Sequence, residues 1–178
     1  MELPNQTAAI FDRLAKGQFI SANSTDPNQR LYFQLLTQHE SAFSEFFNQI
    51  DFKLHRGDGY YYFSRSKSLK SWEDKKDRVE RYIDWLDLLR NWRPKLGAGY
   101  QFSFDELLAD IQSHAKLKRK LYQFVPRGHP DSLADSIRTW LRQLERESFV
   151  EPIDKGEQYQ VLYAFSYLDH FIQQLVIR

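Results

Sequence analysis

Helices that lead into a pair of short strands occur twice in this sequence, and the repetition predicts a mainly α fold of the α+β class with tandem winged-helix domains. In each copy two strands flank a turn that contains glycine: residues 52–54 and 60–63 flank 56–59, and residues 148–153 and 159–163 flank 154–156. The polar stretch Ser64–Lys70 is the best candidate for a boundary. We therefore expect an N-terminal winged-helix domain over residues 1–70 and a C-terminal one over residues 71–178.

The N-terminal domain is expected to contain three helices before its strands. Residues 8–14 have the apolar spacing of a short helix, which Gly17 should end. Asp26 is a suitable N-cap and Pro27 is tolerated in a first turn, so a second helix should start just after them. Apolar residues spaced i, i+3, i+4, i+7 predict the third helix: Phe43, Phe46, Phe47 and Ile50.

The C-terminal domain is expected to open on a long helix and to end on another. Ser71–Asp74 resembles a capping box, and the helix that it opens should run through Trp92. Ser103–Glu106 is the expected cap of a later helix, and Pro130–Ser132 is expected to open another. The helices after the long one are predicted at residues 104–111, 116–122, 132–147 and 166–177, the last with an apolar face that includes Leu175.

The long helix has an unusually wide apolar arc. Beside its main stripe it carries Trp85, Leu88 and Trp92. An arc this wide indicates contact on two sides. Several interpretations are open. The helix bridges the two domains, or these three residues face a partner or a dimer surface, or the helix is the central core helix of its own domain.

The charge is close to neutral in both predicted domains. The formal net charge is +1, with 8 Lys and Arg against 7 Asp and Glu in residues 1–70, and 17 against 17 in residues 71–178. Affinity for nucleic acid rises with the number of phosphates that are neutralised. The composition therefore argues against tight DNA binding by this protein alone.

The sequence contains no recognisable catalytic or cofactor-binding pattern. It has no cysteine, its five histidines are scattered, and it has no glycine-rich phosphate loop. We expect no enzymatic activity, no cofactor and no metal site. The sequence also has no signal-peptide pattern and no apolar run approaching the roughly 20 residues of a membrane span, which predicts a cytoplasmic protein without a membrane partner.

Clusters of basic residues are the candidates for weak contact with DNA. Arg138, Arg142 and Arg146 form an i, i+4, i+8 stripe on the predicted recognition helix, with acidic neighbours that should weaken binding. Arg65, Lys67 and Lys70 follow the first wing, and an ordinary solvated face explains them equally well. The predicted DNA-contacting residues are Lys116, Lys118, Arg119, Lys120, Arg138 and Arg142.

The order and spacing of these segments resemble a known family. Gly17–Ile20, Phe43–Phe47 and Phe52–Phe63 followed by Ser64–Ser66 are similar to the first winged helix of MukE and MksE, the small subunits of bacterial condensins. The second winged helix is similar in Leu107–Leu108, Lys116–Leu121, and Ile137–Arg146 leading into Phe149–Val150. The resemblance covers nearly the whole chain.

The resemblance implies a non-enzymatic, nucleoid-associated subunit. It implies a homodimer that clasps a kleisin subunit of the MukF or MksF type, and that regulates through it a MukB-like or MksB-like SMC ATPase that organises DNA. The sequence lacks the long acidic C-terminal extension of MukE and is shorter, which favours the MksE-like branch. That branch includes relatives that act in plasmid defence as well as in chromosome condensation and segregation.

Two other classes of function compete with this one. A winged-helix transcription regulator would read operator DNA with the helix at residues 132–147, but the near-neutral charge counts against it. A hydrolase or nuclease would need a catalytic set that the sequence does not display.

Overall fold

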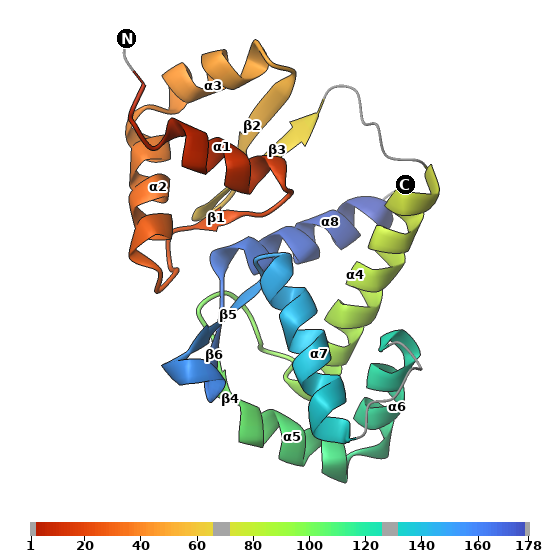
Figure 1. Cartoon of the computed structure of the whole chain (residues 1–178). Helices are drawn as coiled ribbons and strands as arrows, with labels where there is room; N and C mark the ends of the chain where they lie inside the picture. The colour runs from red at the N-terminus through yellow and green to blue at the C-terminus, as the bar shows by residue number, and fades with distance from the viewer. Residues whose placement is uncertain (1–2, 66–71, 126–131, 177–178) are drawn as a thin grey trace.

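The computed structural model describes residues 3–65, 72–125 and 132–176 (Figure 1). We call residues 3–65 the N-terminal half and residues 72–176 the C-terminal half. The N-terminal half contains α1 (Thr7–Ala15), β1 (Ile20–Ser21), α2 (Pro27–Gln38), α3 (Glu40–Asn48), β2 (Phe52–Arg56) and β3 (Tyr60–Arg65). Its strands form an antiparallel sheet in the order β1-β3-β2.

The C-terminal half repeats this plan with additions. It contains α4 (Trp72–Trp92), β4 (Gln101–Ser103), α5 (Phe104–Ser113), α6 (Ala115–Phe124), α7 (Leu133–Arg146), β5 (Val150–Ile153), β6 (Gln158–Val161) and α8 (Ser166–Val176). Short 3-10 turns, η1 (Asp154–Gly156) and η2 (Tyr163–Phe165), follow β5 and β6. Its strands form a second antiparallel sheet in the order β4-β6-β5.

Both halves have the winged-helix order of elements. A helix, a short strand and further helices precede a two-stranded wing, and the last wing strand lies in the middle of each sheet. The C-terminal half differs by the extra helix α6 and the terminal helix α8. The predicted fold class is confirmed. The predicted boundary near residue 70 falls among residues 66–71, outside the described part of the chain, and the domain limits stay a prediction.

The helix starts follow the capping residues. Asp26 accepts a hydrogen bond from the backbone N–H of Asn28 at 2.9 Å, ahead of the proline that begins α2. Ser103 and Ser132 accept from the third residue of the helices that they cap, both at 3.1 Å. The caps at Asp26 and Ser103 were predicted, and Ser132 belongs to the segment that was expected to open its helix. The one expected at Ser71 lies outside the described residues, as does the side chain of Leu175.

The N-terminal core is formed by α1, α2, α3 and the inner face of its sheet. Phe43 and Phe47 of α3 are fully buried there, together with Tyr61 of β3. Only half of the apolar residues expected on this helix are buried, because Phe46 and Ile50 are 39% and 44% exposed. The helix covers the sheet with one narrow stripe, and its adjacent apolar positions remain at the surface.

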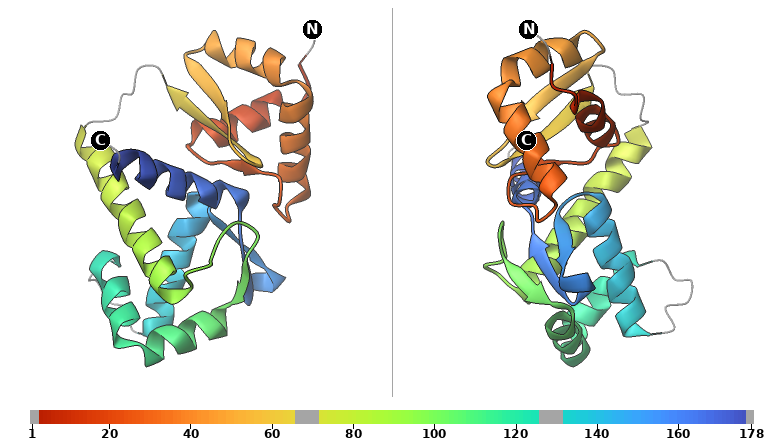
Figure 2. Two further views of the ribbon diagram at one scale, coloured as in Figure 1. Left: turned by 180° about the vertical axis from the view of Figure 1, so that it is seen from behind. Right: turned by 60° about the vertical axis from the view of Figure 1, so that its left-hand side comes forward.

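The long helix α4 is the centre of the C-terminal core. Trp85, Leu88 and Trp92 are only 1%, 1% and 5% exposed, so the expectation that they face a partner is wrong and the core-helix interpretation is correct. The wide apolar arc has an internal cause, because α4 packs against both α6 and α8. Figure 2 shows this helix in yellow-green from behind, with the dark blue α8 and the green-teal α6 beside it.

One strand serves two cores and joins the two halves. The alternation of side chains along β3 points Tyr61 and Phe63 into the N-terminal core, while Tyr60 and Tyr62 pack with the C-terminal core. Tyr62 and Tyr167 of α8 have ring centroids 5.1 Å apart. Phe19, just before β1, also lies in this contact, 5.6 Å from Phe149 by ring centroids.

Buried hydrogen bonds fix the same contact. The carboxylate of Glu151 on β5 accepts from the hydroxyl of Ser24 at 2.7 Å and from the backbone N–H of Thr25 at 2.6 Å. Asn23 donates to the carbonyl of Val161 at 3.1 Å. Because both polar and aromatic contacts span the halves, the described residues form one packed molecule with duplicated architecture.

Candidate interaction surfaces

The recognition helix α7 and its wing form a basic groove. The helix buries its apolar face, with Ile137, Trp140, Leu141 and Leu144 in the core, and leaves Arg138 and Arg142 exposed. The groove beside these arginines has a volume of about 360 Å³. Its lining residues are Arg138, Arg142, Glu145, Pro152, Lys155, Gly156 and Tyr159.

The turn of the wing places a lysine in this groove. Asp154, Lys155 and Gly156 have φ values of 49°, 56° and 86°, so three successive residues are left-handed. This conformation costs a non-glycine residue about 1–2 kcal/mol, and strain of this kind concentrates at functional sites. Lys155 was not among the predicted site residues, although it lies in the turn at residues 154–156 that the sequence predicts between the two strands.

The arginines of the groove are held by neighbouring side chains. The guanidinium of Arg138 lies 3.9 Å from the ring centroid of Phe104, within the range of a cation–π contact. Arg142 donates to the hydroxyl of Thr139 at 3.3 Å. Glu145 adds a negative charge to the same groove, and burial raises the pKa of its carboxyl against the opposing effect of Arg142.

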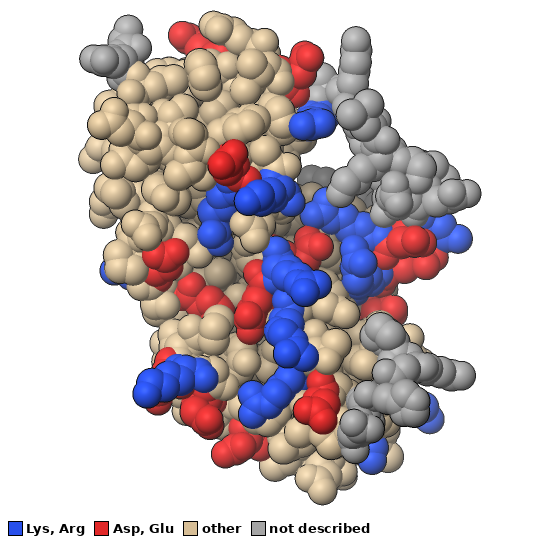
Figure 3. Space-filling view, viewed as in Figure 1, with Lys and Arg blue, Asp and Glu red and all other residues tan. Residues whose placement is uncertain are grey.

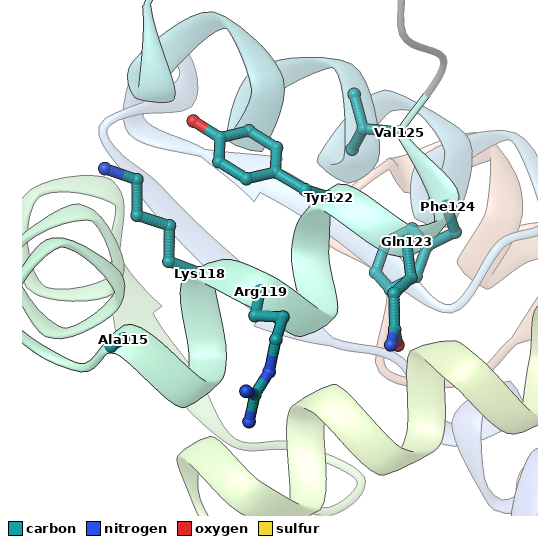
Figure 4. Close-up of a pocket in the computed structure, with 7 residues that line it drawn as sticks. All are labelled: Ala115, Lys118, Arg119, Tyr122, Gln123, Phe124 and Val125. Atoms are coloured by element: carbon teal, nitrogen blue, oxygen red, sulfur yellow. The ribbon is translucent and has the colours of Figure 1, made fainter.

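The four basic residues predicted on the helix before α7 do not share this groove. Lys116, Lys118 and Arg119 are exposed on α6, whereas Lys120 forms an ion pair with Asp87 of α4. Figure 4 shows Lys118 and Arg119 pointing in different directions from α6. Both line a separate pocket of about 940 Å³, with Ala115, Tyr122, Gln123, Phe124 and Val125. The predicted set therefore falls into two surfaces, and Lys120 is already paired.

The basic residues after the first wing are only partly described. Arg65 lies at the end of β3, where its guanidinium is 4.4 Å from the ring centroid of Phe52. Lys67 and Lys70 are outside the described residues.

A third polar surface lies where α1, α4 and α7 meet. Arg78 of α4 donates to Glu147 at 3.0 Å and to the hydroxyl of Tyr82 at 2.8 Å, and that hydroxyl donates to Glu147 at 2.6 Å. Burial of the Tyr82 hydroxyl is the main cause that raises its pKa. The pocket at this surface has a volume of about 390 Å³ and is lined by Lys16, Gly17, Asp77, Arg78, Arg81, Arg146 and Glu147. We call it the junction pocket.

The described part of the chain contains neither a candidate metal site nor a candidate membrane span. Over residues 3–65, 72–125 and 132–176, no group of three or more His, Asp or Glu side chains is placed to hold a metal ion. In the same residues no helix has both the length and the apolar character needed to cross a membrane.

Two winged helices packed into one unit, with a basic groove beside the second recognition helix, define a tandem winged-helix protein. The family model for condensin complex protein MksE matches residues 5–172, and the chain belongs to this family. It is thus a condensin-type accessory subunit. No curated protein sequence matches it. Among solved structures, one titled "Nse1-Nse3-Nse4 complex" aligns with a TM-score of 0.39 and 11% identity, over 98% of this chain and 78% of that chain; a likeness this distant adds nothing to the family assignment.

Proposed function

We propose that this protein is the non-enzymatic subunit of a MukBEF-like or MksBEF-like condensin that binds the kleisin. In this proposal it acts as a homodimer, contacts a kleisin of the MukF or MksF type, and regulates through it an SMC ATPase of the MukB or MksB type. The complex would organise DNA, in chromosome condensation and segregation or in plasmid defence. Membership of the MksE family supports the proposal, and the surface of the N-terminal half is the observation that carries it.

The N-terminal half offers a surface suited to another polypeptide. Figure 3 shows a broad area over α1, α2 and α3, at the upper left, with few charged side chains. Leu31 of α2 is 39% exposed, and Phe46 of α3 and Ile50, two residues after that helix, are similarly exposed. Burying an apolar side chain of this size completely contributes about 1.5–3 kcal/mol. Such a surface favours a protein partner over a polyanion.

A pull-down with a purified kleisin of the MukF or MksF type tests the proposal. The wild-type chain should co-purify with the kleisin, and the double variant Phe46→Ser, Ile50→Ser should lose most of the bound kleisin. Ile83→Ser is the matched control, because Ile83 is also exposed but lies on α4. Circular dichroism should show all three proteins folded. Full retention of kleisin by the double variant would remove this surface from the proposal.

Contact with DNA is the second part of the proposed function. The groove of α7 and the wing holds three cations, Arg138, Arg142 and Lys155, at the position where helix-turn-helix proteins place their recognition helix. Because Glu145 lies among them and the overall charge is only +1, binding by the isolated protein should be weak. The variant Arg138→Gln, Arg142→Gln should bind duplex DNA more weakly and with a shallower salt dependence.

The same groove favours a second candidate function, a transcription regulator. That function requires preference for one DNA sequence, whereas contact within a condensin requires none. Fluorescence anisotropy with one labelled duplex and unrelated competitor duplexes separates the two. Equal competition by unrelated sequences supports the condensin subunit, and a preference of a hundredfold or more for one sequence supports the regulator.

A further inference from the structure

The junction pocket combines cations from both halves of the molecule. Lys16 follows the last turn of α1, Arg81 lies on α4, and Arg146 ends α7. They are far apart in the sequence and are brought together by the fold. All three are exposed.

The pocket has more positive charge than its own carboxylates compensate. Glu147 is already engaged by Arg78 and Tyr82. Among the ion pairs of the described residues, none includes Lys16, Arg81 or Arg146. Among the described residues that line the pocket, Asp77 is then the one further carboxylate. Three cations against one anion make it a site for a negatively charged ligand.

Helix termini explain part of this charge. Arg146 lies in the last turn of α7 and Lys16 is the C-cap of α1, where cations are favoured by the helix dipole. This explanation does not extend to Arg81, which lies in the interior of α4 with its guanidinium 5.8 Å from the ring centroid of Trp85. Nor does it explain why the three cations converge on one pocket.

A buried hydrogen bond behind the pocket holds its two sides together. The backbone N–H of Phe19 donates to the hydroxyl of Ser148 at 3.2 Å. Phe19 follows Lys16 by three residues, and Ser148 follows Arg146 by two. The hydrogen bond therefore fixes the segment that carries Lys16 against the one that carries Arg146, so the site is formed before any ligand binds.

The pocket continues the basic stripe of the recognition helix. Arg138, Arg142 and Arg146 are spaced i, i+4, i+8, which spans about 12 Å along α7 at a rise of 1.5 Å per residue. One strand of duplex DNA carries a phosphate about every 3.4 Å along the axis. Figure 3 shows Lys and Arg side chains in a line over α7 that continues up to the contact between the halves.

We infer that the junction pocket is a second phosphate-binding site for duplex DNA, which extends the groove of α7 and the wing across to the N-terminal half. The inference rests on the proposed DNA contact and deepens it. The ligand is the phosphodiester backbone and not an acidic peptide, because the pocket lies in line with the arginines of a recognition helix. Its role is to position DNA independently of sequence.

Salt titrations of DNA binding by the full chain test this inference. The probe is a labelled duplex of random sequence, followed by anisotropy, and the readout is the slope of log K against log salt. Arg81→Gln, Arg146→Gln should reduce the magnitude of the slope by about 1.8, since each lost phosphate contact contributes about 0.9. Lys53→Gln, Lys95→Gln removes the same charge from exposed positions outside the three pockets and should leave the slope unchanged.

The outcomes separate this inference from the proposed function. If Arg138→Gln, Arg142→Gln lowers the slope while Arg81→Gln, Arg146→Gln behaves like the lysine control, the groove stands and the junction site is wrong. If the wild-type chain shows no salt-dependent binding of DNA, both the groove and the junction pocket fail as DNA-binding sites. If polyglutamate displaces the duplex as effectively as unlabelled DNA of equal charge, the assignment to duplex DNA is wrong.

Discussion

Glu151 is a single carboxylate on which the contact between the halves depends. It is 9% exposed and accepts hydrogen bonds from Ser24 and Thr25 of the other half. Glu151→Gln keeps the shape but turns a donor toward one of these donors, so we expect a loss of about 1–3 kcal/mol in unfolding free energy. Urea denaturation measures it. Glu157→Gln, at an exposed position on the same wing, is the control and should be neutral; equal midpoints for the two variants would contradict this role of Glu151.

Gly59 is a second residue at which the two halves meet closely. Its φ is +79°, and a Cβ atom there would collide with the ring of Tyr163. Gly99 has a similar φ of +83° but open space around it. Gly99→Ala should therefore cost only the backbone strain of about 1–2 kcal/mol, and Gly59→Ala should cost clearly more. Thermal unfolding measures the stability of both variants. Equal losses of stability would mean that the ring of Tyr163 moves aside without a measurable energetic cost.

At the scale of elements, Asp110 connects α5 to the end of α4. Its carboxylate accepts from the indole N–H of Trp92 at 2.9 Å and from Arg93 at 2.7 Å. The bond from Trp92, with the charge of Arg93, lowers the pKa of Asp110. A carboxyl whose folded pKa is lowered stabilises the fold above its unfolded pKa of about 3.9, and this stability is lost as the pH falls through the folded pKa.

Acid unfolding of Asp110→Asn tests this connection. The variant should be less stable at neutral pH and should lose less stability than the wild type between pH 5 and pH 2, since that carboxyl no longer takes up a proton. Asp105→Asn, on the exposed face of the same helix, should follow the wild-type acid curve. Identical acid curves for wild type and Asp110→Asn would show that the contact does not stabilise the fold.

The elements differ in how far the sequence predicts them. Caps at Asp26, Ser103 and Ser132 predict helix starts, because they act through local hydrogen bonds. Strands β1 and β4 were not predicted, because segments of two or three residues are too short to show the alternation of apolar and polar residues that marks a strand. The arc of Trp85 and its neighbours indicated contact on two sides, but only the packing of α6 and α8 shows that both sides are internal.

At the scale of the molecule, the candidate sites depend on the packing of distant segments. The sequence pointed to Arg138 and Arg142 because they share one helix face. It gave no sign that Lys16 and Arg146 converge, because that contact depends on how the two halves pack. Nor does composition distinguish Lys120, which is paired with Asp87, from the exposed Lys118 beside it.

The whole molecule thus presents a surface with few charges on the N-terminal half and a basic one along α7. An apolar interface depends little on ionic strength, whereas phosphate contacts weaken steeply with salt. The two proposed partners should therefore respond differently to salt, although they bind the same small protein.

The most direct test of the central claim is the affinity for the purified kleisin, measured by isothermal titration calorimetry at 50 and 300 mM salt. An interface on the sparsely charged surface of the N-terminal half predicts dissociation constants within about threefold of each other, with a negative heat-capacity change on binding. Absence of binding, or a hundredfold loss of affinity between the two salt concentrations, would contradict the claim that this protein binds a kleisin through apolar contacts.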